Sequence, residues 1–315
     1  MKNIFVSGGA GFIGSHLVRR LLKNSKTKRV TVYDNFSSGK MGYLQDVKDD
    51  KRLAIIKGDI KEIKRLTQAM KGFDVVFHLA SNPDISKAIK FPDVDFWEGT
   101  YLTQNIIEAM RINGVKQIFY TSGSGVYGEC GLKSCPEDHG PLLPISTYAA
   151  SKLAGEALIC SYCHMFDMRG FAFRFANVVG PRQTHGVAYD FINRLRQDPS
   201  ALKILGDGTQ SKSYIHVQDV LNAIFLVAQK SKEKYDCFNV ATGDYITVKE
   251  IADMVVQELG LKALRYDFTG GDRGWKGDVP VVRFNLKKIR KLGWRPQMRS
   301  MAAMRDAIKA MVKGN

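Results

Sequence analysis

Short apolar runs alternate with longer amphipathic stretches through the first half of the chain. The apolar runs predict strands at Lys2–Ser7, Arg29–Tyr33, Leu53–Ile56, Val75–His78, Gln117–Thr121 and Phe171–Phe175. The amphipathic stretches predict helices at Phe12–Lys23, Glu62–Met70, Val94–Asn113 and Ser146–Met168. Because Val, Ile and Phe run almost continuously through the strands, we expect the sheet to be buried on both faces. The alternation predicts an α/β fold with a doubly wound parallel sheet.

The pattern loosens after Asn177. Gly, Pro and mixed charge dominate residues 179–213, and a Gly- and Asp-rich loop follows at Thr269–Pro280. Between them we predict helices near Asp219–Lys230 and at Val248–Leu259. We therefore expect one domain over residues 1–176, to which the chain returns around residues 212–240. A smaller, mixed α/β domain takes up most of residues 177–315.

The first predicted strand leads into a glycine-rich turn. Gly8, Gly11 and Gly14 form G-x-x-G-x-x-G, and a predicted helix starts at Phe12. Glycine permits the tight turn and lets the backbone approach a pyrophosphate. The N–H groups at the start of the helix then face the phosphates. This strand, turn and helix predict a Rossmann dinucleotide-binding domain.

Asp34 follows the second predicted strand, 20 residues after Gly14. An acid at this place hydrogen-bonds the hydroxyls of the adenosine ribose. Its charge would repel a 2′-phosphate. We therefore predict NAD rather than NADP as the cofactor.

Tyr148 and Lys152 are four residues apart on the helix predicted at Ser146–Met168. This spacing places both side chains on one face of the helix. An ammonium next to a phenol favours the phenolate and lowers the phenol's pKa. We therefore expect Tyr148 to be a general base near neutral pH.

The net charge of +16, from 47 Lys+Arg against 31 Asp+Glu, suggests anionic partners. The segment from Leu286 onward carries nine of the basic residues and one acid. Because aromatic residues are scarce there, we interpret it as solvated surface and expect no nucleic-acid partner. No apolar stretch of about 18 residues and no signal-peptide pattern is present, so we expect a cytoplasmic protein without a membrane partner.

Cysteine and histidine spacings give no metal or haem prediction. Cys160-Ser-Tyr-Cys163-His164 matches the haem c attachment pattern, but it lies within a predicted helix and lacks an export signal. Cys130, Cys135 and His139 are too loosely spaced for a zinc site. The odd total of five cysteines favours free thiols.

Taken with these motifs, the chain resembles the nucleotide-sugar epimerase/dehydratase family of extended short-chain dehydrogenase/reductases, as far as Pro280. Further motifs carry the resemblance: residues 34–39 (DNFSSG), 58–60 (GDI), 78–80 (HLA), 126–128 (VYG), 174–182 (RFANVVGPR), 206–210 (GDGTQ) and 214–219 (YIHVQD). Residues 271–280 (GDRGWKGDVP) most resemble the UDP-glucose 4-epimerase-like branch, particularly its archaeal-type members.

The resemblance implies residue roles. Besides Gly8, Gly11, Gly14 and Asp34, it implies NAD contacts from Phe12, Ile13, Asn35, Ser38, Gly39, Asp59, Ile60, Leu79 and Ala80, and from Tyr148 and Lys152. It implies that Asn177 meets the phosphates of a nucleotide-diphosphate sugar. Lys212 stands where the family has a diphosphate-binding Arg, and Lys lacks the bidentate fork.

Three departures from the family pattern concern the sugar site. The Ser or Thr that binds the oxidised sugar hydroxyl is replaced by Gly123, and either neighbour, Ser122 or Ser124, is a candidate substitute. We name Ser124 with Tyr148 and Lys152 as the catalytic set. Residues 123–125 (GSG) lack the Thr-Asp-Glu of the 4,6-dehydratases, which disfavours dehydration. A family Arg is replaced by Trp275, with Arg273 or Lys276 as candidates for its role.

The resemblance implies an NAD-dependent epimerase that acts at C4 of a UDP-glucose/UDP-galactose type sugar through a 4-keto intermediate. A nucleotide-sugar dehydrogenase, decarboxylase or reductase on the same scaffold stays an alternative because of Gly123. A non-catalytic regulatory or RNA-associated protein is a further alternative, since fold does not fix function. The family also implies a homodimer that pairs the helices predicted at Val94–Asn113 and Ser146–Met168.

Overall fold

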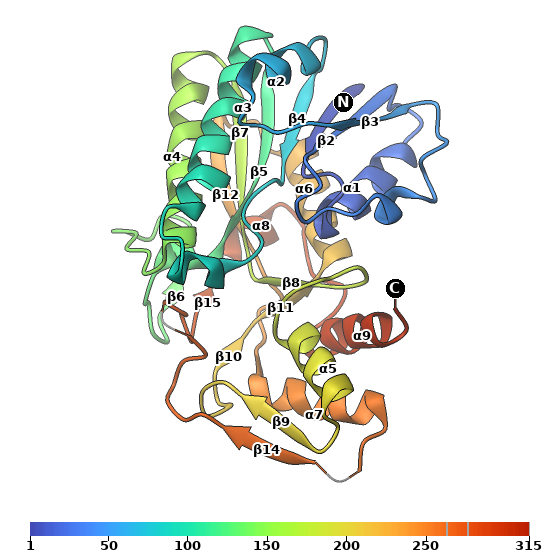
Figure 1. Cartoon of the computed structure of the whole chain (residues 1–315). Coiled ribbons are helices and arrows are strands. Elements are labelled where there is room, and N and C mark those ends of the chain that lie inside the picture. The colour runs from blue at the N-terminus through green and yellow to red at the C-terminus, as the bar shows by residue number, and fades with distance from the viewer. Residues whose placement is uncertain (263, 276, 315) are drawn as a thin grey trace. The chain divides into compact units, whose positions relative to one another are not determined.

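The computed structural model describes residues 1–262, 264–275 and 277–314 (Figure 1). These residues group into two compact units. Unit 1 comprises Met1–Gly123, Thr147–Arg174 and Lys230–Phe238, and unit 2 comprises Ser124–Ser146, Phe175–Gln229 and Asn239–Asn315. Each unit gathers segments that are distant in the sequence. The assignment of NAD to residues 1–176, and of the nucleotide sugar mainly to residues 177–315, stays a prediction.

A seven-stranded sheet organises unit 1. Its strands are β1 (Asn3–Ser7), β2 (Arg29–Asp34), β3 (Leu53–Lys57), β4 (Val75–His78), β5 (Gln117–Gly123), β7 (Arg169–Phe175) and β12 (Tyr235–Val240). They lie in the order β12-β7-β5-β4-β1-β2-β3. β1 pairs in parallel with both β2 and β4, and β3 and β5 extend the parallel pairing. The predicted sheet is confirmed, and its order reverses at β1 and β4, where open α/β sheets bind their ligands.

Helices cover this sheet. In unit 1 they are α1 (Phe12–Leu22), α2 (Ile63–Ala69), α3 (Tyr101–Ile112) and α4 (Thr147–Met165), with 3-10 turns η1 (Met41–Leu44) and η2 (Ile85–Ile89). α3 lies between α2 and α4 and shares a core with the sheet (Figure 1). Phe5 belongs to that core, whereas its neighbours Ile4 and Val6 are buried outside it. Since successive strand residues point to opposite faces, the second face is buried as well, and α1 contacts β1 and β2.

The helix predicted over residues 94–113 begins differently from the prediction. Phe96–Thr100 form a π-helix (η3), and the regular helix α3 starts at Tyr101. Gly99 in η3 lies so close to α4 that a Cβ there would be 2.0 Å from Oγ of Ser151. The π-helix thus lies where η3 approaches α4 most closely at Gly99, and the hydrophobic period of the sequence contains no sign of it.

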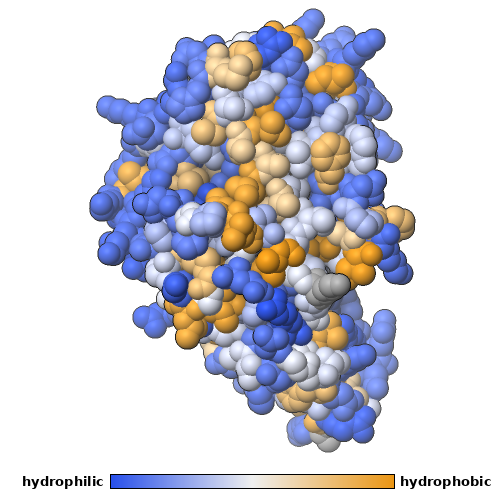
Figure 2. All heavy atoms as spheres, turned by 90° about the vertical axis from the view of Figure 1, so that its left-hand side faces the viewer, coloured by the Kyte–Doolittle hydropathy of each residue, from blue (hydrophilic) through white to orange (hydrophobic). Residues whose placement is uncertain are grey.

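Apolar side chains remain exposed near α3 and α4. Figure 2 shows the side of the molecule on which α4 lies in Figure 1, with apolar residues scattered among polar ones. The exposed apolar residues of this part of unit 1 include Phe96, Trp97, Ile112 and Met165. Within the described residues, no helix is both long and apolar enough to span a membrane.

Unit 2 combines short strand pairs with helices. Its strands are β6 (Ser134–Cys135), β8 (Asn177–Val179), β9 (Ala201–Ile204), β10 (Ser211–Lys212), β11 (Tyr214–His216), β13 (Ile246–Thr247), β14 (Arg265–Phe268) and β15 (Arg283–Phe284). Its helices are η4 (Ser124–Tyr127), α5 (Val187–Gln197), α6 (Val217–Lys230), α7 (Val248–Leu259), α8 (Lys287–Lys291) and α9 (Ser300–Val312). α5, α7 and α9 pack around one apolar core. The predicted mixed α/β character of this part is confirmed, whereas its smaller size is not, because unit 2 is nearly as large as unit 1.

Residues 179–213 are more regular than their composition suggests. They contain α5, β9 and β10, where the sequence pattern predicts no element. Gly186, with a φ of 96°, precedes α5 and supplies no side-chain cap. A glycine at this place removes the usual signal for a helix start.

Candidate active site

The turn between β1 and α1 is built from glycines. Gly8 has a φ of 72°, and its N–H donates to the carbonyl of Tyr33 at 3.1 Å. A Cβ at Gly14 would lie 2.2 Å from the carbonyl oxygen of Gly8, so α1 packs this close because position 14 has no side chain. Gly11 precedes α1 without a side-chain cap. The first N–H groups of α1 are therefore available to a phosphate.

Asp34 ends β2 and joins it to this turn. Its Oδ2 accepts a hydrogen bond from the N–H of Ala10 at 2.9 Å, and its Oδ1 accepts one from the N–H of Phe36 at 2.9 Å. A Cβ at Gly39 would lie 3.0 Å from Oδ1, so this glycine keeps the loop close to the carboxylate. Each carboxylate oxygen retains a lone pair that can accept a ribose hydroxyl.

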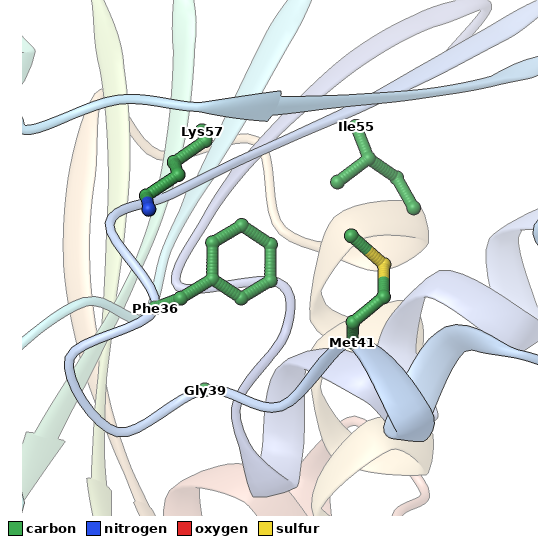
Figure 3. Close-up of a pocket in the computed structure, with 5 residues that line it drawn as sticks. All are labelled: Phe36, Gly39, Met41, Ile55 and Lys57. Carbon is green, nitrogen blue, oxygen red and sulfur yellow. The ribbon is translucent and has the colours of Figure 1, made fainter.

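A cavity of about 410 Å³ lies beside this loop. Figure 3 shows the Phe36 ring between Lys57 and Met41, with Ile55 and Gly39 completing the lining. Apolar walls with a charged group at one edge suit a flat heterocycle. The cavity is therefore a candidate site for the adenine of a dinucleotide.

The other predicted cofactor contacts come from neighbouring strand ends. Nδ2 of Asn35 donates to Oδ2 of Asp59 at 3.4 Å. The N–H of Leu79 donates to the carbonyl of Ser7 at 3.1 Å, which places Leu79 and Ala80 beside the glycine turn. The remaining predicted contacts, Phe12, Ile13, Ser38 and Ile60, lie at the start of α1 and in the loops after β2 and β3. The glycine turn, the carboxylate and the cavity together fit NAD.

Tyr148 and Lys152 lie one turn apart at the start of α4. Nζ of Lys152 is 5.5 Å from the centre of the Tyr148 ring and 5.2 Å from that of Tyr120. It donates a hydrogen bond to the carbonyl of Thr121 at 2.9 Å. Lys152 is buried, and burial lowers the pKa of its amine to about 8. The end of β5 thus fixes a lysine whose charge is costly to keep.

The expected lowering of the Tyr148 pKa by Lys152 is wrong. Burial raises the pKa of Tyr148 to about 12, and the charge of Asp95 acts in the same direction. A hydrogen bond with Ser81 opposes this shift but does not reverse it. Desolvation of the phenolate is the largest cause of the shift. Tyr148 therefore needs further positive charge before it can act as a base near neutral pH.

The two serines that flank Gly123 have different surroundings. Ser122 is buried at the end of β5, and its Oγ donates to Oε1 of Glu156 at 2.5 Å. Ser124 is half-buried, and its hydroxyl has no hydrogen-bond partner among the described residues. A Cβ at Gly123 would meet nothing within 4 Å, so sterics do not require glycine there. Of the two serines, Ser124 has the hydroxyl that is free for a ligand.

Two basic side chains predicted to meet a diphosphate come together at Asp278 in unit 2. Lys212 forms an ion pair with the carboxylate of Asp278. Nη1 of Arg273 donates to the carbonyl of Asp278 at 3.4 Å, and the same guanidinium pairs with Glu129. The other candidate, Lys276, lies outside the described residues. Acidic partners thus balance both cations, and a diphosphate offers charge-assisted hydrogen bonds in their place.

Asn177 lies close to this group through strand pairing. β8 pairs in parallel with β11, with Asn177 opposite Tyr214. The N–H of Asn177 donates to the carbonyl of Ser213 at 3.1 Å, next to Lys212. Its side chain is exposed. The structure therefore brings Asn177, Lys212 and Arg273 to one region of unit 2.

Three acidic residues of these two groups are absent from the predicted site. Asp278 and Glu129 hold the basic side chains of unit 2. Asp95 interacts electrostatically with Tyr148 and Lys152. Asp278 belongs to the motif at residues 271–280, which was a usable signal. No comparable signal marks Glu129 or Asp95.

Comparisons with known proteins agree with this geometry. The profile described as the NAD dependent epimerase/dehydratase family matches residues 4–241. A UDP-glucose 4-epimerase of Mycolicibacterium smegmatis is 33% identical over 301 residues, which cover 93% of this chain and 93% of that protein. A crystal structure of a UDP-galactose 4-epimerase is 36% identical, with a TM-score of 0.87 and 99% of each chain covered. DesIV of Streptomyces venezuelae, a dTDP-glucose 4,6-dehydratase solved with NAD bound, is 26% identical, with a TM-score of 0.90, and the match covers 99% of this chain and 97% of DesIV.

The family match includes the glycine turn, the Asp34 carboxylate and the Tyr148–Lys152 pair. The similarity to the solved epimerase extends over both units. The cofactor of this chain is NAD, because the residues of the nucleotide site fit NAD and the family is NAD-dependent. The chain belongs to the NAD-dependent epimerase/dehydratase family and is an NAD-dependent enzyme of nucleotide-sugar metabolism.

Proposed function

We propose that this enzyme is a 4-epimerase of a nucleotide-diphosphate sugar of the UDP-glucose/UDP-galactose type. The observation that carries the proposal is the Tyr148–Lys152 pair, together with residues 123–125 (GSG) at the end of β5. The chain has a candidate base there, and residues 123–125 lack the Thr-Asp-Glu of the 4,6-dehydratases, so this stretch supplies no carboxyl group to assist loss of water. The relatives named as UDP-glucose and UDP-galactose 4-epimerases support the same choice.

Tyr148 takes the proton from the C4 hydroxyl in this proposal. Bound NAD⁺ would supply the acceptor for the C4 hydride, and epimerisation would require the 4-keto sugar to turn over before the hydride comes back. Lys152 stabilises the phenolate and holds the nicotinamide ribose. Because burial raises the pKa of Tyr148 to about 12, the ammonium of Lys152 and a cationic nicotinamide ring are both needed to make this base effective.

Other side chains hold the substrate. Ser124 donates to the reacting sugar hydroxyl, because the Ser122 hydroxyl is already bonded to Glu156. Lys212 and Arg273 leave their acidic partners to bind the diphosphate, and Asn177 contacts the same phosphates. Such charge-assisted hydrogen bonds stabilise the substrate and fix its orientation.

We also infer a homodimer that pairs α3 and α4 with the same helices of a second copy. The exposed apolar residues Trp97, Ile112 and Met165 support this inference, since a partner surface would cover them. We place the enzyme in the cytoplasm, because its five cysteines are free thiols, as a reducing compartment would keep them.

The decisive experiment incubates the purified protein with UDP-, GDP-, CDP- and dTDP-sugars and follows the sugars by NMR and mass spectrometry. We expect UDP-glucose and UDP-galactose to interconvert to an equilibrium mixture without net formation of NADH. Tyr148→Phe should lower turnover by about 10² to 10⁴ while keeping bound NAD. Accumulation of a 4-keto product, or stoichiometric consumption of added NAD, contradicts the proposal.

Gly123 favours a second candidate, a nucleotide-sugar dehydrogenase, decarboxylase or reductase. Without a hydroxyl at position 123, the sugar has one fewer contact during reorientation. The same panel of sugars distinguishes this candidate, because a dehydrogenase converts added NAD⁺ to NADH in proportion to product.

A further inference from the structure

We propose that Asp95 is a positioning residue for the Tyr148–Lys152 pair: it anchors the first turn of α4 through Thr147 and holds a buried negative charge beside the pair. This role concerns the protein before any sugar binds. It therefore stands apart from the choice of substrate made above.

The carboxylate of Asp95 has two hydrogen-bond partners. Asp95 is the residue immediately before η3, and it is 1% exposed. Oδ1 accepts a hydrogen bond from Nδ2 of Asn82 at 2.8 Å, and Oδ2 accepts one from Oγ1 of Thr147 at 2.7 Å. Thr147 is the first residue of α4, so this bond fixes the helix start directly before Tyr148.

A second contact repeats the first one turn further along both helices. Gly99 lies four residues after Asp95, and Ser151 lies four residues after Thr147. A Cβ at Gly99 would be 2.0 Å from Oγ of Ser151, so the two backbones approach as closely as glycine allows. Tyr148 and Lys152 each follow one of these contact residues. The two contacts therefore fix the position and rotation of the part of α4 that carries the pair.

Asn82, in the loop after β4, joins Asp95 to the helix that follows it. The N–H of Asn82 donates to the carbonyl of Glu98 at 3.1 Å, in addition to the bond from its side chain to Asp95. The carbonyl of Gly99 accepts a hydrogen bond from Thr103 at 3.0 Å. Asp95 thus belongs to a rigid network, which makes its charge a fixed feature of the site.

Asp95 is also placed to act on Lys152 electrostatically. Burial lowers the pKa of Lys152 to about 8, and the charge of Asp95 opposes that change. The other ionisable side chains around the pair are His78 of β4, Tyr120 of β5, Glu156 of α4 and Glu98 of η3.

None of these neighbours supplies a competing negative charge. His78 is neutral, because burial lowers its pKa to about 3. Burial raises the pKa of Tyr120, so its phenol keeps its proton. Glu156 and Glu98 each form an ion pair with a basic residue. Unlike these two glutamates, Asp95 forms no ion pair among the described residues, and its charge favours the protonated form of Lys152.

The electrostatic part is tested by ¹³C NMR of protein labelled at lysine Cε, with NAD bound and no sugar present. Lys152→Arg assigns the signal. We expect Asp95→Asn to lower the titration midpoint of Lys152 by about one pH unit. Asparagine keeps both hydrogen bonds, since its oxygen accepts from Asn82 and its NH₂ group donates to Thr147.

The matched control is Asp93→Asn. It makes the same chemical change two residues earlier, at an exposed residue, and should leave the midpoint unchanged. Equal midpoints in the wild type and Asp95→Asn overturn the electrostatic role, as does an equal shift in the control.

The anchoring part is tested separately by hydrogen exchange. Thr147→Val keeps the shape of the side chain but removes the donor to Asp95. We expect amides 151–155 of α4 to exchange about tenfold faster, as loss of one hydrogen bond implies, while the Lys152 midpoint stays in place. Unchanged protection overturns the anchoring role. Neither measurement uses a sugar, so a failure of the proposed epimerase activity would leave both results decisive.

Discussion

The hydroxyl of Ser122 donates a hydrogen bond to Oε1 of Glu156 at 2.5 Å, and the same carboxylate forms a buried ion pair with Arg174 at 2.7 Å. This arrangement links α4, the helix that carries Tyr148 and Lys152, to strands β5 and β7 of the seven-stranded sheet. A buried ion pair needs every one of its polar atoms satisfied to be tolerated. Ser122 therefore has a structural task, and its neighbour Ser124 is left for the substrate.

We expect Ser122→Ala and Ser124→Ala to differ in kind. Ser122→Ala removes a donor from a buried carboxylate and should lower the free energy of unfolding by about 1–3 kcal/mol, measured by urea denaturation. Ser124→Ala should leave stability unchanged and lower kcat by about tenfold or more, measured by NMR with UDP-galactose. The reverse pattern would show that Ser122 is the residue that meets the sugar.

Position 123 offers a direct test of the missing hydroxyl. A Cβ there meets nothing within 4 Å, so Gly123→Ser should fold normally, with an unfolding free energy within about 0.5 kcal/mol of wild type. We expect it to raise kcat for epimerisation, because it restores a donor to the sugar hydroxyl. Gly123→Ala is the matched control and should not. If both variants raise kcat equally, backbone stiffening rather than the hydroxyl is responsible.

The fold was predictable where local pattern and packing agree. β1 and β4 are apolar and buried at nearly every position, whereas the edge strand β3 is only partly buried, and the predicted strands match β1 to β5 within two residues. The π-helix at Phe96–Thr100 was not predictable, because the close approach of Gly99 to Ser151 is a tertiary contact without a sequence pattern. α9 was not predicted, although Ala303 and Ile308 are buried, because the charge of residues 286–315 as a whole suggested solvated surface.

The identity of the candidate site residues was predictable, but their pKa values and ion pairs were not. Spacing alone places Tyr148 and Lys152 on one face, and their proximity follows from helix geometry. The pKa of each depends instead on burial and on Asp95, which lies more than 50 residues earlier in the chain. The acid that pairs with Lys212 is likewise distant, at Asp278. Interactions of this kind arise from tertiary structure; Asp278 at least belongs to a recognisable motif, whereas nothing local marks Asp95.

Lys212 should contribute to substrate binding rather than to the chemical step. Its ammonium pairs with Asp278 in unit 2 and has the charge that a diphosphate requires. We expect Lys212→Ala to raise KM for the nucleotide sugar about tenfold or more with little change in kcat, measured by initial rates. Lys212→Arg is the matched control and should keep KM near wild type. An equal loss of kcat in both variants would instead indicate a role in the reaction itself.

The close approach of η3 to α4 should be sensitive to a single methyl group. Gly99→Ala places a Cβ 2.0 Å from Oγ of Ser151, so the serine hydroxyl or the helices themselves must shift. We expect a loss of about 1–3 kcal/mol in unfolding free energy, measured by urea denaturation, together with lower kcat. Gly99→Ala combined with Ser151→Ala removes the nearest atom and should recover most of the stability. A double variant no better than the single one would show that the clash lies elsewhere.

Lys152 should make the stability of the enzyme depend on alkaline pH. Burial lowers its pKa from 10.5 to about 8, so between these values the unfolded chain binds a proton that the folded chain has released. Unfolding free energy therefore rises with pH across this window, and the cost of burying the charge is fully present below pH 8. For a residue 4% exposed, the shift corresponds to about 3 kcal/mol.

Urea denaturation of wild type and Lys152→Met at intervals from pH 7.5 to 10.5 isolates this effect, since all other groups are shared. We expect Lys152→Met to be more stable below pH 8 and its advantage to shrink as the pH rises; a constant difference would mean that Lys152 keeps an ordinary pKa.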